Sequence, residues 1–287
     1  MLVILFFAAF EVDPAMQRIA EDALSQALTN KNVAGGIVLI GDPNDGRVLA
    51  VAGMHRSPLD ETITIASLAK TFVVAAALDG GTTTAGAMHD CTKGGGLGDW
   101  KAFGSLSSRD TLVFSSNVCS YDVASQLGAP RMQDAFTRFG FSTAAAALTD
   151  YAVGSIRVSP LEVLQAYGAI ANGGELLAPK SATDRSGKVV VRRVLSEKTA
   201  REVRGMLALV VTEGTAKSIA AAVPALAGKT GSLEGGSGAS FVGYAPAESP
   251  RIVALVYLDG NGAQIYGGSV AAPVFARVSA GALALRQ

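Results

Sequence analysis

Apolar runs and short polar breaks alternate along the chain, and the length of each run separates helices from strands. Residues 63–78 are apolar and alanine-rich and contain no Gly or Pro, which predicts a helix. Residues 239–244 and 251–258 are shorter, carry β-branched and aromatic side chains, and are bounded by Gly or Pro, which predicts two strands. The Gly-rich and Pro-containing links next to these runs indicate a meander of adjacent antiparallel strands.

The same pattern gives the order of the remaining elements. We expect an N-terminal strand, a helix over 14–29, a hairpin over 36–53, a helical region over 67–174, a helix over 197–213, a strand through 229 and a closing helix over 271–285. Because antiparallel strands group at both ends of the sequence with helices between them, the predicted fold class is α+β. A functional site would then lie in the cleft between the sheet and the helical lobe.

Composition narrows the possible functions only slightly. The chain of 287 residues carries 24 basic and 24 acidic side chains, so its net charge is zero and nothing indicates binding to nucleic acid. The length fits a single catalytic domain over 1–287, with a helical lobe over 60–175 and a sheet lobe formed by 11–59 and 176–287. Only two histidines and two cysteines are present, and they form no zinc-binding pattern, so we expect neither a metal nor a cofactor.

The first ten residues, MLVILFFAAF, are strongly apolar. This segment is too short to span a membrane and lacks the basic start of a signal peptide. It is either a trimmed export segment or a first β-strand, and the strand fits the remaining pattern better.

Three short motifs occur once each, in a fixed order: Ser67-Leu-Ala-Lys70, Ser115-Ser-Asn117 and Lys229-Thr-Gly-Ser232. Each alone has an ordinary structural explanation, such as a helix cap, a turn or a strand end. Together they supply a hydroxyl nucleophile, two amines, a second hydroxyl and an amide. That combination can attack an acyl group and hold the product as an ester without a histidine or a metal.

The first motif has the spacing that nucleophile activation requires. Ser67 falls in the first turn of the predicted helix and Lys70 lies three residues on, so both side chains share one helix face. The apolar run around them buries the helix, and burial favours the neutral form of an amine. Lys70 could therefore act as the general base for Ser67. Because guanidinium does not lose its proton, arginine at position 70 should fail.

The third motif lies at the end of a predicted strand. Gly231 would allow close approach of a ligand backbone, and an extended substrate could pair with the strand edge. Thr230 and Ser232 would present hydroxyl groups to a carboxylate, and Lys229 would add positive potential. The structural alternative for Lys229 is a solvated lysine that protects a sheet edge from aggregation.

With these motifs in place, the chain resembles the transpeptidase domain of penicillin-binding proteins, within the serine acyl-transferases that include serine β-lactamases. The resemblance extends over about residues 12–285. It also includes residues 12–18, the 35–53 hairpin with its 43–46 turn, the helix and glycine stop over 158–174, Glu213-Gly-Thr215 and 241–246. It implies an antiparallel five-stranded sheet with flanking helices plus a mostly helical lobe.

The resemblance also implies a role for each motif residue. Ser67 would be acylated and Lys70 would be its base. Ser115 would relay a proton to the leaving amine with electrostatic support from Lys229, and Asn117 would hold the peptide amide of the substrate.

For the remaining groups, the resemblance implies that Thr230 and Ser232 hold the terminal carboxylate of the substrate. The backbone N–H groups of Ser67 and Ser232 would form the oxyanion hole.

The implied function is a penicillin-binding D,D-transpeptidase that acts on peptidoglycan stem peptides ending in D-Ala-D-Ala, with β-lactams as covalent inhibitors. Its location would be extracytoplasmic, as inferred from the substrate. The alternatives are a D,D-carboxypeptidase, a serine β-lactamase, and a β-lactam sensor without turnover. Glu162, the nearest candidate for a lactamase water-activating base, is better explained as the helix-capping partner of Ser159. The sequence does not separate transfer to an amine from transfer to water.

Two departures from the family pattern stand out. Ile65-Ala66 precedes the nucleophile where Pro-Gly is common, and Phe103-Gly104 stands where His-Gly is frequent. Ser232 in place of the commoner Thr is a milder change.

The two cysteines, Cys91 and Cys119, flank the second motif. They fit either one disulfide in an exported protein or two free thiols without a functional role. Since free buried cysteine is common, we favour two thiols.

Overall fold

The computed structural model describes residues 10–142, 147–221 and 225–286. The expected first strand or export segment therefore lies outside the described residues, except for Phe10, which is in neither a helix nor a strand. Among the described residues, no helix is long and apolar enough to cross a membrane.

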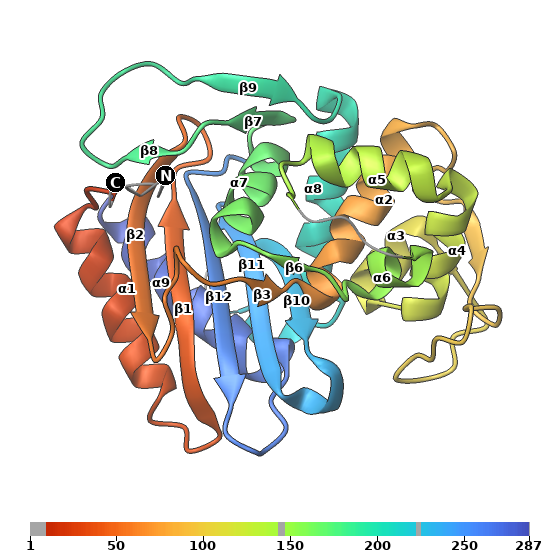
Figure 1. Ribbon diagram of the computed structural model, residues 1–287, viewed down its shortest axis with the longest axis horizontal. Helices are drawn as coiled ribbons and strands as arrows, with labels where there is room; N and C mark the ends of the chain where they lie inside the picture. The colour runs from red at the N-terminus through yellow and green to blue at the C-terminus, as the bar shows by residue number, and fades with distance from the viewer. Residues whose placement is uncertain (1–9, 143–146, 222–224, 287) are drawn as a thin grey trace, which may run out of the picture.

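A six-stranded sheet forms the centre of the molecule, with strand order β10-β11-β12-β1-β2-β8 (Figure 1). Five neighbouring strands are antiparallel, as predicted, and the short β8 adds to the edge of β2 in parallel. The strands of this sheet are β1 (Val33–Gly41), β2 (Arg47–Met54), β8 (Lys180–Ser181), β10 (Ala227–Ser232), β11 (Gly238–Ala245) and β12 (Ile252–Gly260).

Helices cover both faces of the sheet, which explains why β11 and most of β12 are buried without alternation. The α-helices are α1 (Pro14–Ala27), α2 (Ala69–Asp79), α3 (Ser108–Phe114), α4 (Asn117–Leu127), α5 (Ala129–Arg138), α6 (Leu148–Val153), α7 (Pro160–Ala171), α8 (Glu197–Thr212) and α9 (Ala272–Ala284). The terminal helices α1 and α9 pack together on one face, and α7 and α8 pack on the other.

The helical lobe stands beyond the β10 edge of the sheet and is built around α2 (Figure 1). Residues 69–77 of α2 are buried on every side, because α3, α4, α5, α6 and α8 surround this helix. Phe72 lies at the centre of an aromatic cluster with Phe136, Phe139, Phe141 and Tyr167. The all-round burial predicted from the apolar run is confirmed, and it gives the start of α2 a rigid base.

Within the described ranges, three small pairs of strands were not predicted. They are β3 (Ile63–Thr64) with β6 (Arg157–Val158), β4 (Met88–Asp90) with β5 (Ser105–Ser107), and β7 (Glu175–Leu177) with β9 (Val190–Arg193). The predicted helix over 63–78 is correspondingly shorter: β3 occupies its first residues, and a 3-10 turn over Ala66–Leu68 precedes α2.

The two cysteines form a disulfide, so the prediction of two free thiols is wrong. Cys91 follows β4 and Cys119 lies in the first turn of α4, and their Cα atoms are 4.5 Å apart. Both residues are buried, but α4 packs against β4 and so places the two sulfur atoms at bonding distance. The bridge ties the β4–β5 connection to the helix that begins at the second motif.

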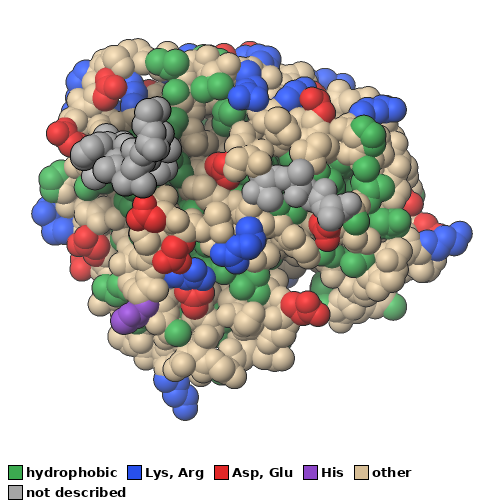
Figure 2. All heavy atoms as spheres, viewed as in Figure 1, with side chains coloured by type: hydrophobic (Ala, Val, Ile, Leu, Met, Phe, Trp, Pro, Cys, Tyr) green, Lys and Arg blue, Asp and Glu red, His purple; other side chains and the backbone are tan. Residues whose placement is uncertain are grey.

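The face shown in Figure 2 carries acidic and basic side chains interspersed among apolar ones. No broad patch of one charge covers this view, in keeping with the zero net charge of the chain.

Candidate active site

Ser67 lies in the 3-10 turn that leads into α2, and backbone contacts fix this turn. The N–H of Ile65 donates to Ile156 O at 2.9 Å, and the N–H of Ala66 donates to Gly154 O at 2.9 Å. Ala66 has a φ of +49°, in the left-handed region that favours glycine. The departure from Pro-Gly noted in the sequence therefore puts an alanine into a glycine-like conformation beside the nucleophile.

Lys70 is one turn after Ser67, and its amine is at the centre of the site. Its Nζ lies 2.5 Å from Ser67 Oγ and 2.6 Å from Asn117 Oδ1, with Ser115 Oγ at 3.5 Å. The side chain is completely buried. The amine is thus in direct contact with the hydroxyl it is predicted to activate.

The second motif forms a sharp turn between α3 and α4. Ser115 ends α3 with a φ of +60°, and Ser116 caps α4 by accepting a hydrogen bond from Cys119 N. Asn117 then begins α4, and its Nδ2 donates to Gly98 O at 2.8 Å. The turn points Ser115 and Asn117 to the same amine, which their spacing alone did not establish.

Lys229 reaches the same centre from β10. Its Nζ donates to Ser115 Oγ at 2.8 Å and to Thr230 O at 3.0 Å, and its side chain is completely buried. The alternative of a solvated edge lysine is therefore wrong: this lysine faces the site and not the solvent.

Burial changes the charge state of both amines. It lowers the pKa of Lys70 to about 7, against the raising effect of the negative Asp99. Burial also lowers the pKa of Lys229 well below its ordinary value, and the nearby Lys70 lowers it further. A neutral Lys70 is accessible near neutral pH, so the proton of Ser67 can be taken up by this amine.

The rest of the third motif presents its hydroxyl groups to the cleft, each with a partner. Thr230 Oγ1 lies 2.6 Å from Thr215 Oγ1, and Ser232 Oγ accepts a hydrogen bond from Gly267 N at 3.0 Å. A Cβ on Gly231 would lie 2.3 Å from Ser240 Oγ and 3.2 Å from Leu68 Cγ. Glycine is therefore required here by packing between β11 and the turn of the nucleophile, in addition to the predicted approach of a ligand.

Two open cavities meet at the nucleophile. One, of about 550 Å³, is lined by Ser67, Trp100, Thr215, Thr230 and Tyr266, among others. The second, of about 780 Å³, is bordered by Ser67, Leu97, Asn117, Gly154 and Glu234, among others. An extended ligand could therefore pass Ser67 along β10 with space on both sides of the reacting bond.

Sequence reasoning missed several residues at this site. Asp99 and Trp100 come from the β4–β5 connection, and Tyr266 comes from the segment before the π-helical turn at Gly267–Ala271. Thr215 was noted only as part of a resemblance. The sequence signal for Asp99 is an acidic residue followed directly by a tryptophan in an otherwise Gly-rich loop.

Glu162 caps α7, as predicted. Its Oε2 accepts from Ser159 N at 2.9 Å, and its Oε1 accepts from Ser142 N at 3.2 Å. Ser159 in turn accepts from Leu161 N. One carboxylate oxygen therefore caps the helix and the other holds the segment that follows α5, so both are engaged.

A hydroxyl–imidazole–carboxylate array also exists outside this site, but it is buried. His89 lies 2.7 Å from Ser108 Oγ through Nε2 and 2.9 Å from Asp122 Oδ2 through Nδ1. Ser108 is fully buried and His89 is 2 % exposed, so a substrate cannot reach this serine. The array instead joins β4 to α3 and α4.

The model of the penicillin binding protein transpeptidase domain matches residues 36–280 of this chain. Among curated proteins, a probable peptidoglycan D,D-transpeptidase, PbpC, of Pseudomonas aeruginosa is 28 % identical and is matched over 96 % of this chain and 58 % of its own length. The probable peptidoglycan D,D-transpeptidase PenA of Neisseria gonorrhoeae is 27 % identical over 95 % of this chain and 56 % of its own length. The chain thus spans little more than half the length of these relatives.

Solved structures of similar proteins share the fold of this chain. The transpeptidase domain of penicillin-binding protein 3 from Burkholderia pseudomallei, solved without ligand, superposes with a TM-score of 0.83 at 28 % identity and covers 97 % of this chain and 96 % of its own. A structure described as a peptidoglycan glycosyltransferase from Burkholderia ambifaria also reaches 0.83 at 28 % identity, with 96 % and 97 % covered. The α+β fold with its helical lobe is shared with these proteins over nearly the full length of the chain.

Proposed function

The chain belongs to the penicillin-binding protein transpeptidase family, and from that premise we propose that it is a serine D,D-transpeptidase acting on peptidoglycan stem peptides that end in D-Ala-D-Ala. One observation carries the proposal: a buried amine, Lys70, lies 2.5 Å from Ser67 Oγ and 2.6 Å from Asn117 Oδ1, and these two partners line both open cavities. Burial keeps this amine able to accept a proton near neutral pH.

Acylation begins with transfer of the Ser67 proton to neutral Lys70. Ser67 Oγ then attacks the carbonyl carbon of the penultimate D-Ala, and the carbonyl oxygen takes up the negative charge. We assign the oxyanion hole to the backbone N–H groups of Ser67 and Ser232, as the family resemblance implies. The C–N bond breaks, the leaving D-Ala amine receives a proton through Ser115, and the ester on Ser67 remains.

The neighbouring groups fit supporting roles. Lys229 donates to Ser115 Oγ, which keeps a proton source beside the leaving group. Asn117 faces the second cavity and can bind the peptide amide of the donor. Thr230 and Ser232 line the first cavity, where a carboxylate would meet their hydroxyl groups and Lys217. In the second half-reaction an acceptor amine attacks the ester; attack by water would make the protein a carboxypeptidase.

The β-lactamase alternative needs a base that activates water on the ester. Glu162, the candidate from the sequence, has both carboxylate oxygens engaged at the start of α7. This arrangement favours a long-lived acyl-enzyme, as in a transpeptidase inhibited by penicillin. With peptidoglycan as the substrate, we propose an extracytoplasmic location and a single catalytic domain over 1–287.

The test is labelling by a fluorescent penicillin, followed by the lifetime of the adduct and by release of D-Ala from a stem pentapeptide. We expect a labelled protein with an adduct stable for hours, and release of D-Ala that rises when an acceptor amine is added. Ser67→Ala should abolish both, whereas Ser105→Ala, at an exposed position of β5, should change neither.

The outcomes separate the candidates. Turnover of penicillin within seconds would identify a lactamase, and labelling without release of D-Ala would identify a sensor. Absence of labelling in the folded protein would rule out an acyl-enzyme on Ser67.

A further inference from the structure

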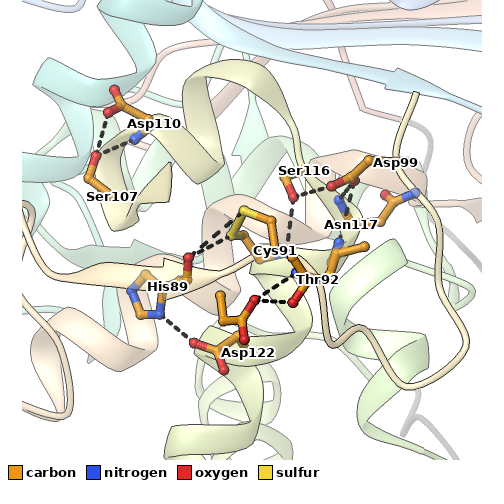
Figure 3. Close-up of a disulfide and its surroundings, with 12 residues drawn as sticks. His89, Cys91, Thr92, Asp99, Ser107, Asp110, Ser116, Asn117 and Asp122 are labelled. Atoms are coloured by element: carbon orange, nitrogen blue, oxygen red, sulfur yellow. Dashed lines mark hydrogen bonds and ion pairs between the residues drawn. A yellow bond between two sulfur atoms is a disulfide. The ribbon is translucent and has the colours of Figure 1, made fainter. Parts of the chain in front are cut away.

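Three consecutive residues of the connection between β4 and β5, which spans residues 91–104, form hydrogen bonds to the second motif or to the residue before it. Gly98 O accepts from Asn117 Nδ2 at 2.8 Å, and Trp100 Nε1 donates to Phe114 O at 3.1 Å. Between them, Asp99 contacts the turn itself. The disulfide ties the start of this connection to Cys119 in the first turn of α4 (Figure 3).

The carboxylate of Asp99 accepts hydrogen bonds from two consecutive residues of the turn between α3 and α4: Ser116, which caps α4, and Asn117, which begins it. Its Oδ2 accepts from Ser116 Oγ at 2.6 Å, and its Oδ1 accepts from Asn117 N at 2.5 Å. Val118 N lies 3.4 Å from the same Oδ1. Figure 3 shows Asp99 pointing into this turn. A carboxylate on the free N–H groups at a helix start also interacts favourably with the helix dipole.

These contacts place Asn117 between a carboxylate and the catalytic amine. Its backbone is held by Asp99, its Nδ2 by Gly98 O, and its Oδ1 faces Lys70 Nζ at 2.6 Å. With both ends of the side-chain amide engaged, its orientation is defined. Loss of the Asp99 contacts would loosen a residue that touches both the base and the second cavity.

Asp99 is also the acidic group that acts on Lys70. The other ionisable group in this cluster is the Lys229 amine, which approaches from β10, and a positive Lys70 lowers the pKa of that amine. The remaining neighbours of Lys70 Nζ at hydrogen-bond distance, Ser67, Ser115 and Asn117, are uncharged. Asp99 therefore favours the protonated form of Lys70, which burial disfavours.

We propose that Asp99 is a positioning residue for acylation: its carboxylate holds the Ser116–Asn117 turn against Lys70 and places a negative charge one residue away from the buried amine, across Asn117. This inference rests on the proposed acyl-enzyme on Ser67. It assigns a role to a residue outside the three motifs, on a loop that the disulfide fastens to α4.

The main test is the pH dependence of the second-order rate constant for labelling by a fluorescent penicillin, measured between pH 5.5 and 9. Asp99→Asn keeps the size of the side chain but removes its charge. Because protonated Lys70 loses a nearby negative charge, the pKa of Lys70 falls. The acid limb of the pH–rate profile, where the labelling rate rises with pH, should therefore move to lower pH by about half a unit or more. The plateau rate should also fall, by about tenfold, because Asn117 is less firmly held.

Two variants separate charge from folding. Asp99→Glu restores the charge, so its acid limb should return to within about 0.2 units of the wild-type limb even where the rate stays low. Asp110→Asn is the matched control: Asp110 also accepts a serine hydroxyl, from Ser107 at 2.7 Å, at the start of a neighbouring helix. This control should leave the pH profile unchanged.

A second readout needs no acylation. The Lys70 amine can be titrated by NMR in lysine-labelled protein, with its signal assigned by its absence in Lys70→Met. A lower midpoint in Asp99→Asn than in the wild type supports the proposal. An unchanged midpoint, or an equal shift in Asp110→Asn, overturns it. Since this titration does not depend on penicillin, failure of the role of Asp99 is distinguishable from failure of the acyl-enzyme.

Discussion

The turn that carries Ser67 and the turn that carries Asn117 meet at Lys70, but different kinds of contact hold them. Backbone hydrogen bonds to the α6–β6 segment fix the first turn, and a Cβ on Gly154 would lie only 1.9 Å from Ala66 O. Side-chain acceptors and a disulfide on a loop fix the second. A backbone contact of this kind tolerates no added atom, whereas the loop contacts can be weakened one at a time.

The largest effect should come from the close contact behind the nucleophile. In Gly154→Ala the new methyl would collide with Ala66 O, and the φ of +73° at this position also disfavours alanine. Displacement of Ser67 by even about 1 Å should reduce penicillin labelling by about 100-fold or more. Gly187→Ala, where nothing lies within 4 Å, is the control and should label normally. A Gly154→Ala protein with normal labelling would show that the turn does not depend on this contact.

The amine shared by both turns should control the pH dependence of acylation. Burial lowers the pKa of Lys70 to about 7, and only the neutral amine accepts the proton of Ser67. The labelling rate should therefore fall about tenfold per pH unit below pH 7 and level off above it. A flat rate between pH 5.5 and 7 would contradict Lys70 as the base.

The same shift affects stability with a defined sign. Because the unfolded chain takes up a proton at Lys70 near its ordinary pKa of 10.5, this group makes the free energy of unfolding decrease as the pH falls from 10.5 toward 7.

Removal of the disulfide beside the second turn should have a smaller effect on penicillin labelling. The bridge closes a sequence separation of 28, so replacing both cysteines by alanine should lower the free energy of unfolding by about 3 kcal/mol, as measured by urea denaturation. Labelling should slow only several-fold, since Asp99 and Gly98 still hold Asn117.

Reductant provides the check on this prediction. It should reproduce both changes in the wild type and have no effect on the double variant. Two free thiols in the untreated wild type would show that the bridge is absent.

The smallest effect should come from the alanine before the nucleophile. Ala66→Gly removes the cost of a left-handed alanine at a φ of +49°, so the free energy of unfolding should rise by about 0.5–1 kcal/mol. Labelling should change less than about threefold, because the backbone hydrogen bond of residue 66 is retained. Ala75→Gly, in the interior of α2, should instead lower stability by about 1 kcal/mol or more. Destabilisation by both substitutions would show that Ala66 is not strained.

The parts of the fold that the sequence predicted well are long and locally patterned. The predicted ranges for α1, α8, α9, the first hairpin and the strands β10 to β12 differ from the structure by a few residues. The pairs β3–β6, β4–β5 and β7–β9 escaped prediction, because strands of two to four residues exist only through the partner they meet. The disulfide was missed for a similar reason: nothing local indicates that Cys91 and Cys119 approach each other.

The sequence by itself determined the chemical groups of the site and one of its distances, because Ser67 and Lys70 are separated by a single turn. It also determined the order of the three motifs and the class of the fold. Only the tertiary structure decided that Lys229 faces inward and that Asp99 reaches the start of α4. It also decided that burial lowers the pKa of two amines. Spacing along a helix is a local property, whereas desolvation and contacts between distant segments arise only when the sheet and the helical lobe close around the same amine.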